Sequence, residues 1–306
     1  MTYIHPRGAK KFLKEKICKP IIANYLNGNN YLTPQTVALV TGGASGLGLA
    51  IVNELLTKGI DKVIIIDVVP PKPRLMENSR VIYYHCDISI YEEVVNLRAK
   101  VNSECGTVSL IINNAGITSI GTLVETPEER IEQIFKVNFS GSYHIMNLFL
   151  PDLAKKNGGY LVNVVSVLGE VTPARLIAYG SSKGALIGFH NRLSDKYRNS
   201  AELGRSKIRM LLVCPGKLET TMFGEVRTPS SILAPDVKVD RLAFLIVRAI
   251  QNNETGFLRQ PYYTNIIPLL DYLDWPYIHL FKRVSGMNKA TNVRPGTNVI
   301  VKSRRY

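Results

Sequence analysis

The chain has 306 residues, of which 45% are hydrophobic and 20% are charged. Such a composition can bury a large core, and it excludes a disordered tail, a collagen-like repeat and a disulfide-stapled miniprotein. The formal net charge of +14 lies mainly at the two ends, since residues 1–36 carry +5, residues 281–306 carry +7 and residues 37–280 carry only +2. We therefore expect a nearly neutral domain with two basic termini.

The basic termini suit an anionic membrane surface at least as well as nucleic acid. No stacking motif or recognition module accompanies them, so we expect no nucleic-acid partner. The cysteines are far apart and form no CxxC or Cys/His cluster, which predicts reduced thiols and no metal site at Cys18, Cys86, Cys105 and Cys214. No run approaches the roughly eighteen apolar residues of a membrane span, and residues 1–20 lack the apolar centre of a secretory signal, so we expect a cytoplasmic location.

Short β-branched runs alternate with segments of helical period, which predicts βαβ units and a parallel sheet. Strands are expected, in chain order, at residues 37–40, 62–67, 81–85, 108–113, 160–166 and 207–213. Helices are expected at residues 46–55, from about residue 91, and at about residues 178–197. A further helix has a start signal in which Thr126 is the N-cap, Pro127 the first helical residue and Glu129 the end of a capping box. The expected fold class is α/β, a single doubly wound parallel sheet with helices on both faces and short terminal helical appendages.

A glycine-rich turn lies between the first expected strand and its helix, with the sequence Thr41-Gly42-Gly43-Ala44-Ser45-Gly46-Leu47-Gly48. A dinucleotide pyrophosphate needs backbone N–H donors at a helix N-terminus without side chains in the way, and the glycines provide this. The second strand ends in Asp67, near the distance of about 20 residues at which a carboxylate binds the adenosine ribose hydroxyls. The alternative is a tight turn with a solvated aspartate. We expect a Rossmann-like dinucleotide site.

Asp67 also bears on the choice of cofactor. A carboxylate there would repel the 2′-phosphate of NADP and would bond to the free hydroxyls of NAD, so NAD(H) is favoured. The following loop carries Lys72 and Arg74, which could bind that phosphate if the loop folded back. NADP(H) therefore remains the alternative.

Tyr179 and Lys183 are four residues apart on an expected helix and so share one face. Ser166 lies thirteen residues before Tyr179, at the carboxyl end of the fifth expected strand, where open parallel sheets place their ligand crevice. Asn138 falls in the preceding helix. Each residue alone has an ordinary structural explanation, but their combination with the glycine loop indicates a catalytic site.

These motifs resemble the short-chain dehydrogenase/reductase superfamily over about residues 35–260. The resemblance rests on the loop at residues 41–48 and on Asp87, Asn113-Asn114-Ala115-Gly116, Asn138, Ser166, Tyr179, Lys183, Pro215-Gly216, Thr220 and Met222. Residues 121–156, Gly188-Phe189-His190 and the apolar C-terminal region are similar to the retinol dehydrogenase and 17β-hydroxysteroid dehydrogenase type 11 branch. The expected domains are therefore a catalytic NAD(P)-binding unit at residues 35–260, a basic amphipathic appendage at residues 1–34, and an aromatic and apolar block with a basic tail at residues 261–306.

The resemblance implies an oxidoreductase that interconverts an alcohol and a carbonyl. It implies catalytic roles for Asn138, Ser166, Tyr179 and Lys183, and substrate contacts from Ser166, Leu168 and Tyr179. It implies cofactor contacts from Thr41, Gly42, Ser45, Gly46, Leu47, Gly48, Asp67, Asp87, Ile88, Asn114, Ala115, Gly116, Tyr179, Lys183, Pro215, Gly216, Leu218 and Thr220. It also implies a homodimer or tetramer that pairs through the helices containing Asn138 and Tyr179.

A phenol is a poor base at neutral pH, because its unperturbed pKa is about 10. The Lys183 ammonium and the positive nicotinamide are expected to lower the pKa of Tyr179, while Ser166 orients the substrate oxygen. Asn138 is expected, by resemblance, to hold a water that links Lys183 to solvent. Two alternatives remain open: a 3-oxoacyl thioester reductase, and a non-enzymatic membrane-associated scaffold that binds the cofactor.

The termini suggest a lipophilic substrate such as a retinoid, steroid or long-chain lipid. Residues 10–26 place basic residues beside apolar ones at i+4 spacing, although Pro20 interrupts them, and residues 262–281 form a dense aromatic and apolar block. Aromatic and basic residues together suit a bilayer interface, so peripheral contact with the cytosolic face of an endoplasmic reticulum or lipid-droplet membrane is expected. Equally, the block could pack on the core as a substrate lid or a dimer contact.

Overall fold

Aliphatic residues fill the central strands of the chain on both faces, which requires helices on both sides of the sheet. The computed structural model describes residues 30–155, 158–199, 208–224, 234–272, 274 and 276–284. Its parallel sheet has the strand order β3-β2-β1-β4-β5-β6-β7. The strands are β1 (Val37–Thr41), β2 (Lys62–Asp67), β3 (Val81–His85), β4 (Leu110–Asn113), β5 (Gly159–Val164), β6 (Ile208–Pro215) and β7 (Gly256–Gln260).

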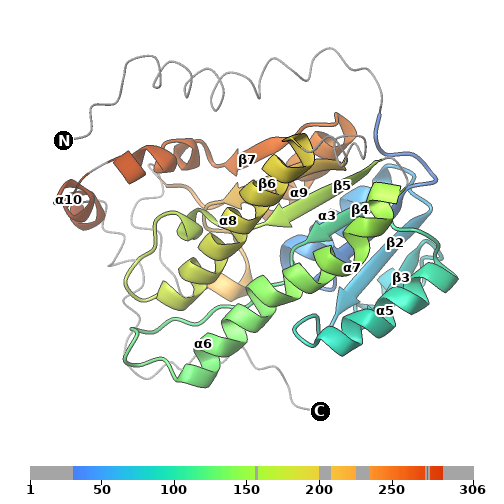
Figure 1. Ribbon diagram of the computed structural model, residues 1–306, viewed down its shortest axis with the longest axis horizontal. Helices are drawn as coiled ribbons and strands as arrows, with labels where there is room; N and C mark the ends of the chain where they lie inside the picture. Colours follow the sequence, from blue (N-terminus) through green and yellow to red (C-terminus); the bar gives the residue numbers. More distant parts are fainter. Residues whose placement is uncertain are drawn as a thin grey trace.

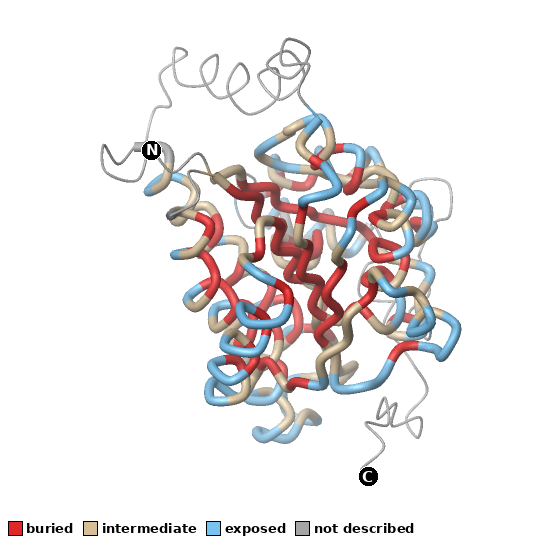
Figure 2. The backbone as a smooth tube through the Cα atoms, turned by 90° about the vertical axis from the view of Figure 1, so that its right-hand side faces the viewer, coloured by how far each residue is buried: buried red, intermediate tan, exposed pale blue. Residues whose placement is uncertain are grey.

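The helices form one layer on each face of the sheet (Figure 1). Helices α3 (Gly46–Thr57) and α9 (Val239–Gln251) pack in one core cluster, and α5 (Tyr91–Glu104), α7 (Ser142–Lys155) and α8 (Ile177–Asn199) pack in the other. Figure 2 shows buried residues along the central strands and exposed residues on the outer turns of the helices. The predicted α/β fold with a doubly wound parallel sheet is confirmed.

The strand order reverses between β1 and β4, so the crevice for a ligand lies at the carboxyl ends of these strands. The predicted strands are present, with small shifts: the fifth ends at Val164, two residues before Ser166, and the sixth continues to Pro215. Residue 207, the predicted start of the sixth strand, lies outside the described residues. Strand β7 and helix α9 were not predicted. Strand β7 is the edge strand next to β6, and α9 covers one face of the sheet.

The predicted helix start at Thr126 is wrong. Helix α6 spans Glu128–Phe135, its N-cap is Pro127, and no side chain caps it. The Thr126 hydroxyl instead donates to the Thr122 carbonyl at 2.8 Å. A reciprocal pair of bonds does occur four residues earlier, where Thr122 N donates to Glu125 Oε2 (3.0 Å) and Glu125 N donates to Thr122 Oγ1 (3.3 Å). The capping box that forms is therefore that of Thr122 and Glu125, which closes a turn before α6 and does not cap α6 itself.

One turn of wider helix separates α6 from α7. Residues Lys136–Gly141 form a π-helix, η2, which carries Asn138. Such turns are rare and occur often at functional sites. The single helix expected around Asn138 is thus two helices joined by an irregular turn.

The C-terminal described residues form the short helices η6 (Tyr262–Asn265), η7 (Ile267–Tyr272) and α10 (Tyr277–Val284). Ile267 and Leu270 are buried against Val167 and Val171, so part of the aromatic and apolar block packs on the core. The basic region of residues 1–29 and the tail after residue 284 lie outside the described residues, and the domain boundaries remain predictions. Among the described helices, none is both long and apolar enough to cross a membrane.

Candidate active site

Four polar side chains from three elements meet at the carboxyl end of the sheet. Asn138 comes from η2, Ser166 follows β5, and Tyr179 and Lys183 are one turn apart on α8. None of the four is more than 5% exposed. Gly116, which follows β4, is close to two of them, since a Cβ added there would lie 3.2 Å from Asn138 Oδ1 and 3.3 Å from Lys183 Nζ. The predicted catalytic residues are therefore assembled in one buried cluster.

The Tyr179 hydroxyl bonds to the Ser166 side chain. Ser166 Oγ also accepts a hydrogen bond from Leu168 N at 3.1 Å, and it is the N-cap of the short helix η3 (Val167–Gly169). Lys183 Nζ lies 5.9 Å from the centroid of the Tyr179 ring and donates to the Val164 carbonyl at 3.1 Å. Helical spacing thus places the amine and the phenol on the same side of α8, as predicted.

Burial dominates the ionisation of both groups. It raises the pKa of Tyr179 above its usual value, which the hydrogen bond with Ser166 partly offsets. It lowers the pKa of Lys183 to about 8, because the ammonium is removed from water. The protein alone therefore favours a neutral phenol, and a phenolate needs further positive charge.

Asn138 has protein partners on both ends of its amide. Its Oδ1 accepts from Ile117 N at 2.8 Å, and its Nδ2 donates to the Ile117 carbonyl (3.0 Å) and to Ser182 Oγ (2.9 Å). Ser182 Oγ in turn donates to the Tyr179 carbonyl at 2.7 Å. Asn138 thereby fixes the chain after Gly116 against helix α8. Ser182 completes this link and was missed as a site residue, although it lies inside the Tyr179–Lys183 motif and is fully buried.

The glycine loop has the geometry of a phosphate cradle. Gly42 and Gly46 have φ angles of +65° and +52°, which favour glycine. The N-cap Ser45 makes no side-chain bond to the helix start, and a Cβ on Gly46 would meet only Thr220 Cγ2, at 3.9 Å. The open start of α3 therefore fits a dinucleotide pyrophosphate, and Thr220 lies beside it.

Other residues of the predicted cofactor set build the loop rather than face an open space. Thr41 Oγ1 accepts from Asn114 N (3.0 Å) and Ala115 N (3.1 Å), and Asn114 Nδ2 donates to the carbonyls of Thr41 and Gly42, each at 3.1 Å. Leu47 and Gly48 are buried, and a Cβ on Gly48 would collide with the Gly42 carbonyl and with Asn114 Nδ2. These contacts tie the end of β1 to the end of β4.

Asp67 lies at the end of β2 beside this loop. Its Oδ2 accepts from Ala44 N at 3.0 Å, and its Oδ1 accepts from Val69 N at 3.2 Å. Each carboxylate oxygen keeps a second lone pair, so the side chain can both anchor the loop and accept from ribose hydroxyls. The position fits the adenosine end of a dinucleotide.

Asp87 and Ile88, also predicted to contact the cofactor, are engaged in their own turn. Asp87 Oδ1 accepts from Ser89 N (2.9 Å) and Ser89 Oγ (2.7 Å), and the Ile88 carbonyl accepts from His144 Nδ1 (2.9 Å). Asp87 N donates to Glu93 Oε2 at 2.8 Å. Asp87 and Ile88 therefore stabilise the turn that follows β3.

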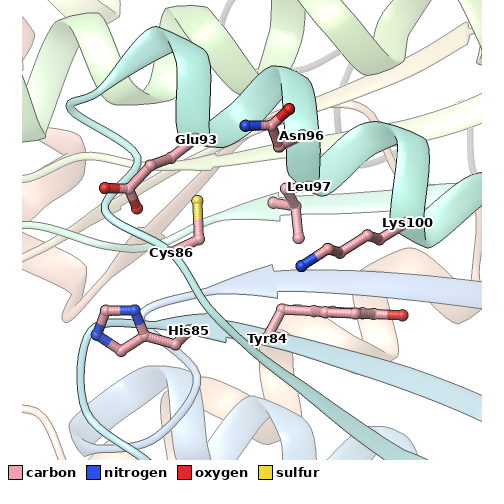
Figure 3. A pocket seen from close by; sticks show the side chains of 7 residues that line it. All are labelled: Tyr84, His85, Cys86, Glu93, Asn96, Leu97 and Lys100. Atoms are coloured by element: carbon pink, nitrogen blue, oxygen red, sulfur yellow. The ribbon is translucent and has the colours of Figure 1, made fainter.

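A surface hollow of about 210 Å³ lies between β3 and α5, next to Asp87. Figure 3 shows the Glu93 carboxylate pointing from α5 toward the strand end that carries Cys86. Burial, together with Glu93 and Asp87, raises the pKa of Cys86 to about 12, so its thiol stays protonated. The hollow is at the β3 edge, four strands from β5, and is separate from the catalytic cluster.

The surroundings of Tyr179 are apolar. Its ring packs edge to face on Phe223, with centroids 5.5 Å apart and planes at 77°. Phe223 belongs to η5 (Thr221–Phe223), whose N-cap position is Thr220. The other side chains of this cluster are Ile120, Leu168, Leu176 and Met222. Leu168 thus lies where a substrate contact was predicted.

The turn at Pro215 and Gly216 is held by the C-terminal part of the chain. Gly216 N donates to the Gln260 carbonyl at 2.7 Å, and a Cβ on Gly216 would lie 2.5 Å from Tyr263 Oη. Leu218 forms a bridge with Val237. Arg259 pairs with Glu170, four residues after Ser166 (Nη1 to Oε2, 2.7 Å), and donates to the Thr264 carbonyl at 3.2 Å. This ion pair connects the Ser166 loop to the C-terminal segment.

Comparisons with known proteins identify the family of the chain. The model of the short chain dehydrogenase family matches residues 36–231. An uncharacterized oxidoreductase of Saccharomyces cerevisiae is 42% identical over 266 residues, which are 86% of each chain. Estradiol 17-beta-dehydrogenase 11 of Rattus norvegicus is 31% identical over 71% of this chain and 73% of its own, and retinol dehydrogenase 10-B of Danio rerio is 36% identical over 57% of this chain and 52% of its own.

A solved structure has the same fold. The ligand-free aldohexose dehydrogenase of Thermoplasma acidophilum superposes with a TM-score of 0.64 and 23% identity, and the match covers 76% of this chain and 94% of that one. The family match spans more than half of the chain, and it includes the glycine loop and all four residues of the buried cluster. The chain belongs to the short-chain dehydrogenase family and is an oxidoreductase.

Proposed function

We propose that the protein is an NAD(P)-dependent oxidoreductase that interconverts an alcohol and a carbonyl on a lipophilic substrate. The observation that carries this proposal is the buried cluster in which Tyr179 bonds to Ser166 and lies one helical turn from Lys183. Interconversion of an alcohol and a carbonyl moves a proton as well as a hydride. A phenol that lies beside a hydroxyl and an amine can carry this proton.

Tyr179 is the proton-transfer group of the proposal. In oxidation its oxygen takes the proton of the substrate hydroxyl, while Ser166 Oγ hydrogen-bonds to the substrate oxygen and orients it. In reduction the Tyr179 hydroxyl returns the proton to the carbonyl oxygen. Lys183 favours the phenolate by its positive charge, and Asn138 and Ser182 hold helix α8 in place.

In this proposal the glycine loop would hold the dinucleotide, because Gly46 leaves the start of α3 open, and Asp67 would bond to its ribose hydroxyls. A bound dinucleotide would supply the acceptor for the hydride of the alcohol carbon, or the hydride donor for the carbonyl carbon. Thr220, next to Gly46, and the Pro215–Gly216 turn are proposed to border it. Asp87, Ile88, Ala115 and Leu218 complete the proposed contacts.

A lipophilic substrate is favoured by the lining of the site. The side chains around Tyr179 and Leu168 are aliphatic or aromatic, so a polar substrate would lose its hydration without gaining partners there. Two relatives are named for estradiol and for retinol, which are both lipophilic alcohols. A retinoid, a steroid or a long-chain lipid alcohol is the proposed substrate class.

The test is a substrate panel with each of NAD(H) and NADP(H). Retinoid, steroid and long-chain alcohols and their carbonyl forms are compared with short polar alcohols and a 3-oxoacyl thioester. Apolar alcohols or carbonyls are expected to have the higher kcat/KM. Preference for the thioester would favour a 3-oxoacyl thioester reductase, and absence of turnover with bound dinucleotide would favour a scaffold.

Cofactor choice is tested by Asp67→Asn, which keeps one acceptor oxygen, enough for either Ala44 N or Val69 N, and removes the negative charge. Because a like charge at the 2′-phosphate costs several kcal/mol, kcat/KM with NADP(H) is expected to rise about tenfold or more relative to NAD(H). The matched control is Asp61→Asn, an exposed aspartate just before β2. An unchanged ratio in Asp67→Asn would remove Asp67 from the cofactor assignment.

We also propose that the enzyme pairs through α7 and α8 as a homodimer or tetramer. Tyr143 on α7 is 40% exposed, and its ring packs edge to face on Phe189 of α8. The basic termini extend the proposal to peripheral contact with an anionic membrane, where a lipophilic substrate would be concentrated. Light scattering in solution measures the oligomeric state directly.

A further inference from the structure

The segment after β7 has two chemically distinct faces. Thr264, Ile267 and Leu270 are buried and recur every third residue, which matches the three residues per turn of the short helices η6 and η7. Three other residues of the segment, Tyr262, Ile266 and Leu269, are exposed. The aromatic and apolar block of the sequence therefore packs on the core with one side only.

The inner side is attached to the wall of the active site. Ile267 and Leu270 pack against Val167, which directly follows Ser166, and against Val171 farther along the same loop. Farther along, Lys282 Nζ of α10 donates to the Thr172 carbonyl at 3.3 Å. The segment is thus fixed to the loop that carries Leu168, at both η7 and α10.

The outer side is mainly apolar, since its exposed residues are large apolar side chains together with Asn265 and Asp274. We call it the outer face, and its exposed fractions are 82% for Tyr262, 51% for Ile266, 46% for Leu269, 62% for Tyr277 and 56% for Leu280. Tyr277 and Leu280 are three residues apart on α10 and so share a helical face. Figure 1 shows α10 at the edge of the molecule, away from the strands. Five large exposed side chains within one short segment indicate a surface that binds something.

The acids of this segment end at Asp274, and beyond it the charge of the chain is only positive, which favours an anionic partner. Arg283 in the last turn of α10 is exposed, and residues 281–306 contain seven Lys or Arg and no acid. Tyrosines beside aliphatic side chains suit the boundary between water and hydrocarbon, and a basic tail is attracted to anionic headgroups. A second copy would bring an equally basic tail to the same place, which like-charge repulsion opposes.

We propose that the outer face docks on an anionic lipid bilayer. The segment of η6, η7 and α10 would then lie on the membrane, and the same segment supports the loop after Ser166. A substrate dissolved in the lipid would therefore reach the site from the membrane side. The docking assigns a surface to the membrane contact of the proposed function and rests on it, and its consequence for substrate supply rests on the proposed catalytic activity.

The experiment uses the full chain and vesicles of phosphatidylcholine with and without phosphatidylserine. Co-sedimentation measures binding. The emission of Trp275, the single tryptophan of the chain, reports on the polarity around the connection between η7 and α10. Wild type is expected to bind the anionic vesicles with a blue shift of this emission. The double variant Ile266→Glu/Leu269→Glu is expected to bind more than tenfold more weakly, because two apolar contacts with the bilayer are replaced by two negative charges.

The matched control is Met76→Glu, which places the same charge at an exposed apolar position of the short helix α4 (Pro73–Met76) and should bind as wild type does. Arg283→Glu, which alters only charge, should weaken binding to anionic vesicles, so the test survives if the double variant unfolds. Tyr179→Phe should bind normally without turnover, which separates docking from catalysis. Equal binding by the outer-face and control variants would overturn the proposal, as would a dimer that Ile266→Glu/Leu269→Glu dissociates without any change in vesicle binding.

Discussion

Tyr179→Phe is expected to lower kcat by about 10²–10⁴-fold, the usual contribution of a positioned acid or base. The substitution removes only the hydroxyl that bonds to Ser166 and leaves the edge-to-face packing on Phe223. The protein should therefore fold and bind dinucleotide as wild type does. Steady-state turnover on the best substrate of the panel, with dinucleotide affinity from fluorescence titration, measures both effects.

Tyr84→Phe is the control for this prediction. It also removes a phenolic hydroxyl, which donates to Glu104 Oε2 at 2.6 Å, but it lies on β3 at the far edge of the sheet. Its turnover should equal that of wild type. If Tyr179→Phe retained full turnover while Tyr84→Phe did the same, proton transfer would have to be assigned to another group.

Gly48→Ala is expected to destabilise the fold and to abolish measurable dinucleotide binding. The added methyl group would collide with the Gly42 carbonyl and with Asn114 Nδ2, the two groups that join the ends of β1 and β4. Overpacking of this kind typically costs about 1–3 kcal/mol, and here it displaces the loop itself. Thermal unfolding and dinucleotide titration are the measurements.

Gly188→Ala provides the comparison on helix α8. A Cβ at Gly188 would meet nothing within 4 Å, so the same change should be neutral or slightly stabilising there. If Gly48→Ala unfolded at the wild-type temperature and bound dinucleotide equally well, the glycine loop could accommodate a side chain at this position, and the predicted collision would be wrong.

Residues whose spacing is set by a regular element could be placed from the sequence. Tyr179 and Lys183 share a face because a helix has 3.6 residues per turn, and Ser166 follows a strand whose carboxyl end borders the crevice. The glycine loop was recognisable because its conformation restricts the choice of residues. Predictions of this type need only local geometry.

Other features depend on contacts between distant parts of the chain. Thr126 has the residue type of an N-cap, but its hydroxyl is taken by Thr122. The π-helical turn at Asn138 and the link through Ser182 depend on packing of η2 against α8, which periodicity does not encode. The effect of burial on the pKa values of Tyr179 and Lys183 also depends on the assembled core. The sequence indicates the attraction between the ammonium and a phenolate, but not the desolvation that disfavours both charged forms.

The pairing of Arg259 with Glu170 has a consequence for biosynthesis. The two residues are 89 positions apart in the chain. During translation the ribosome must release strand β7 before the loop after Ser166 can gain this partner. A nascent chain that has already formed β1 to β5 thus still lacks the ion pair that holds the loop after Ser166, which can form only once Arg259 has been synthesised.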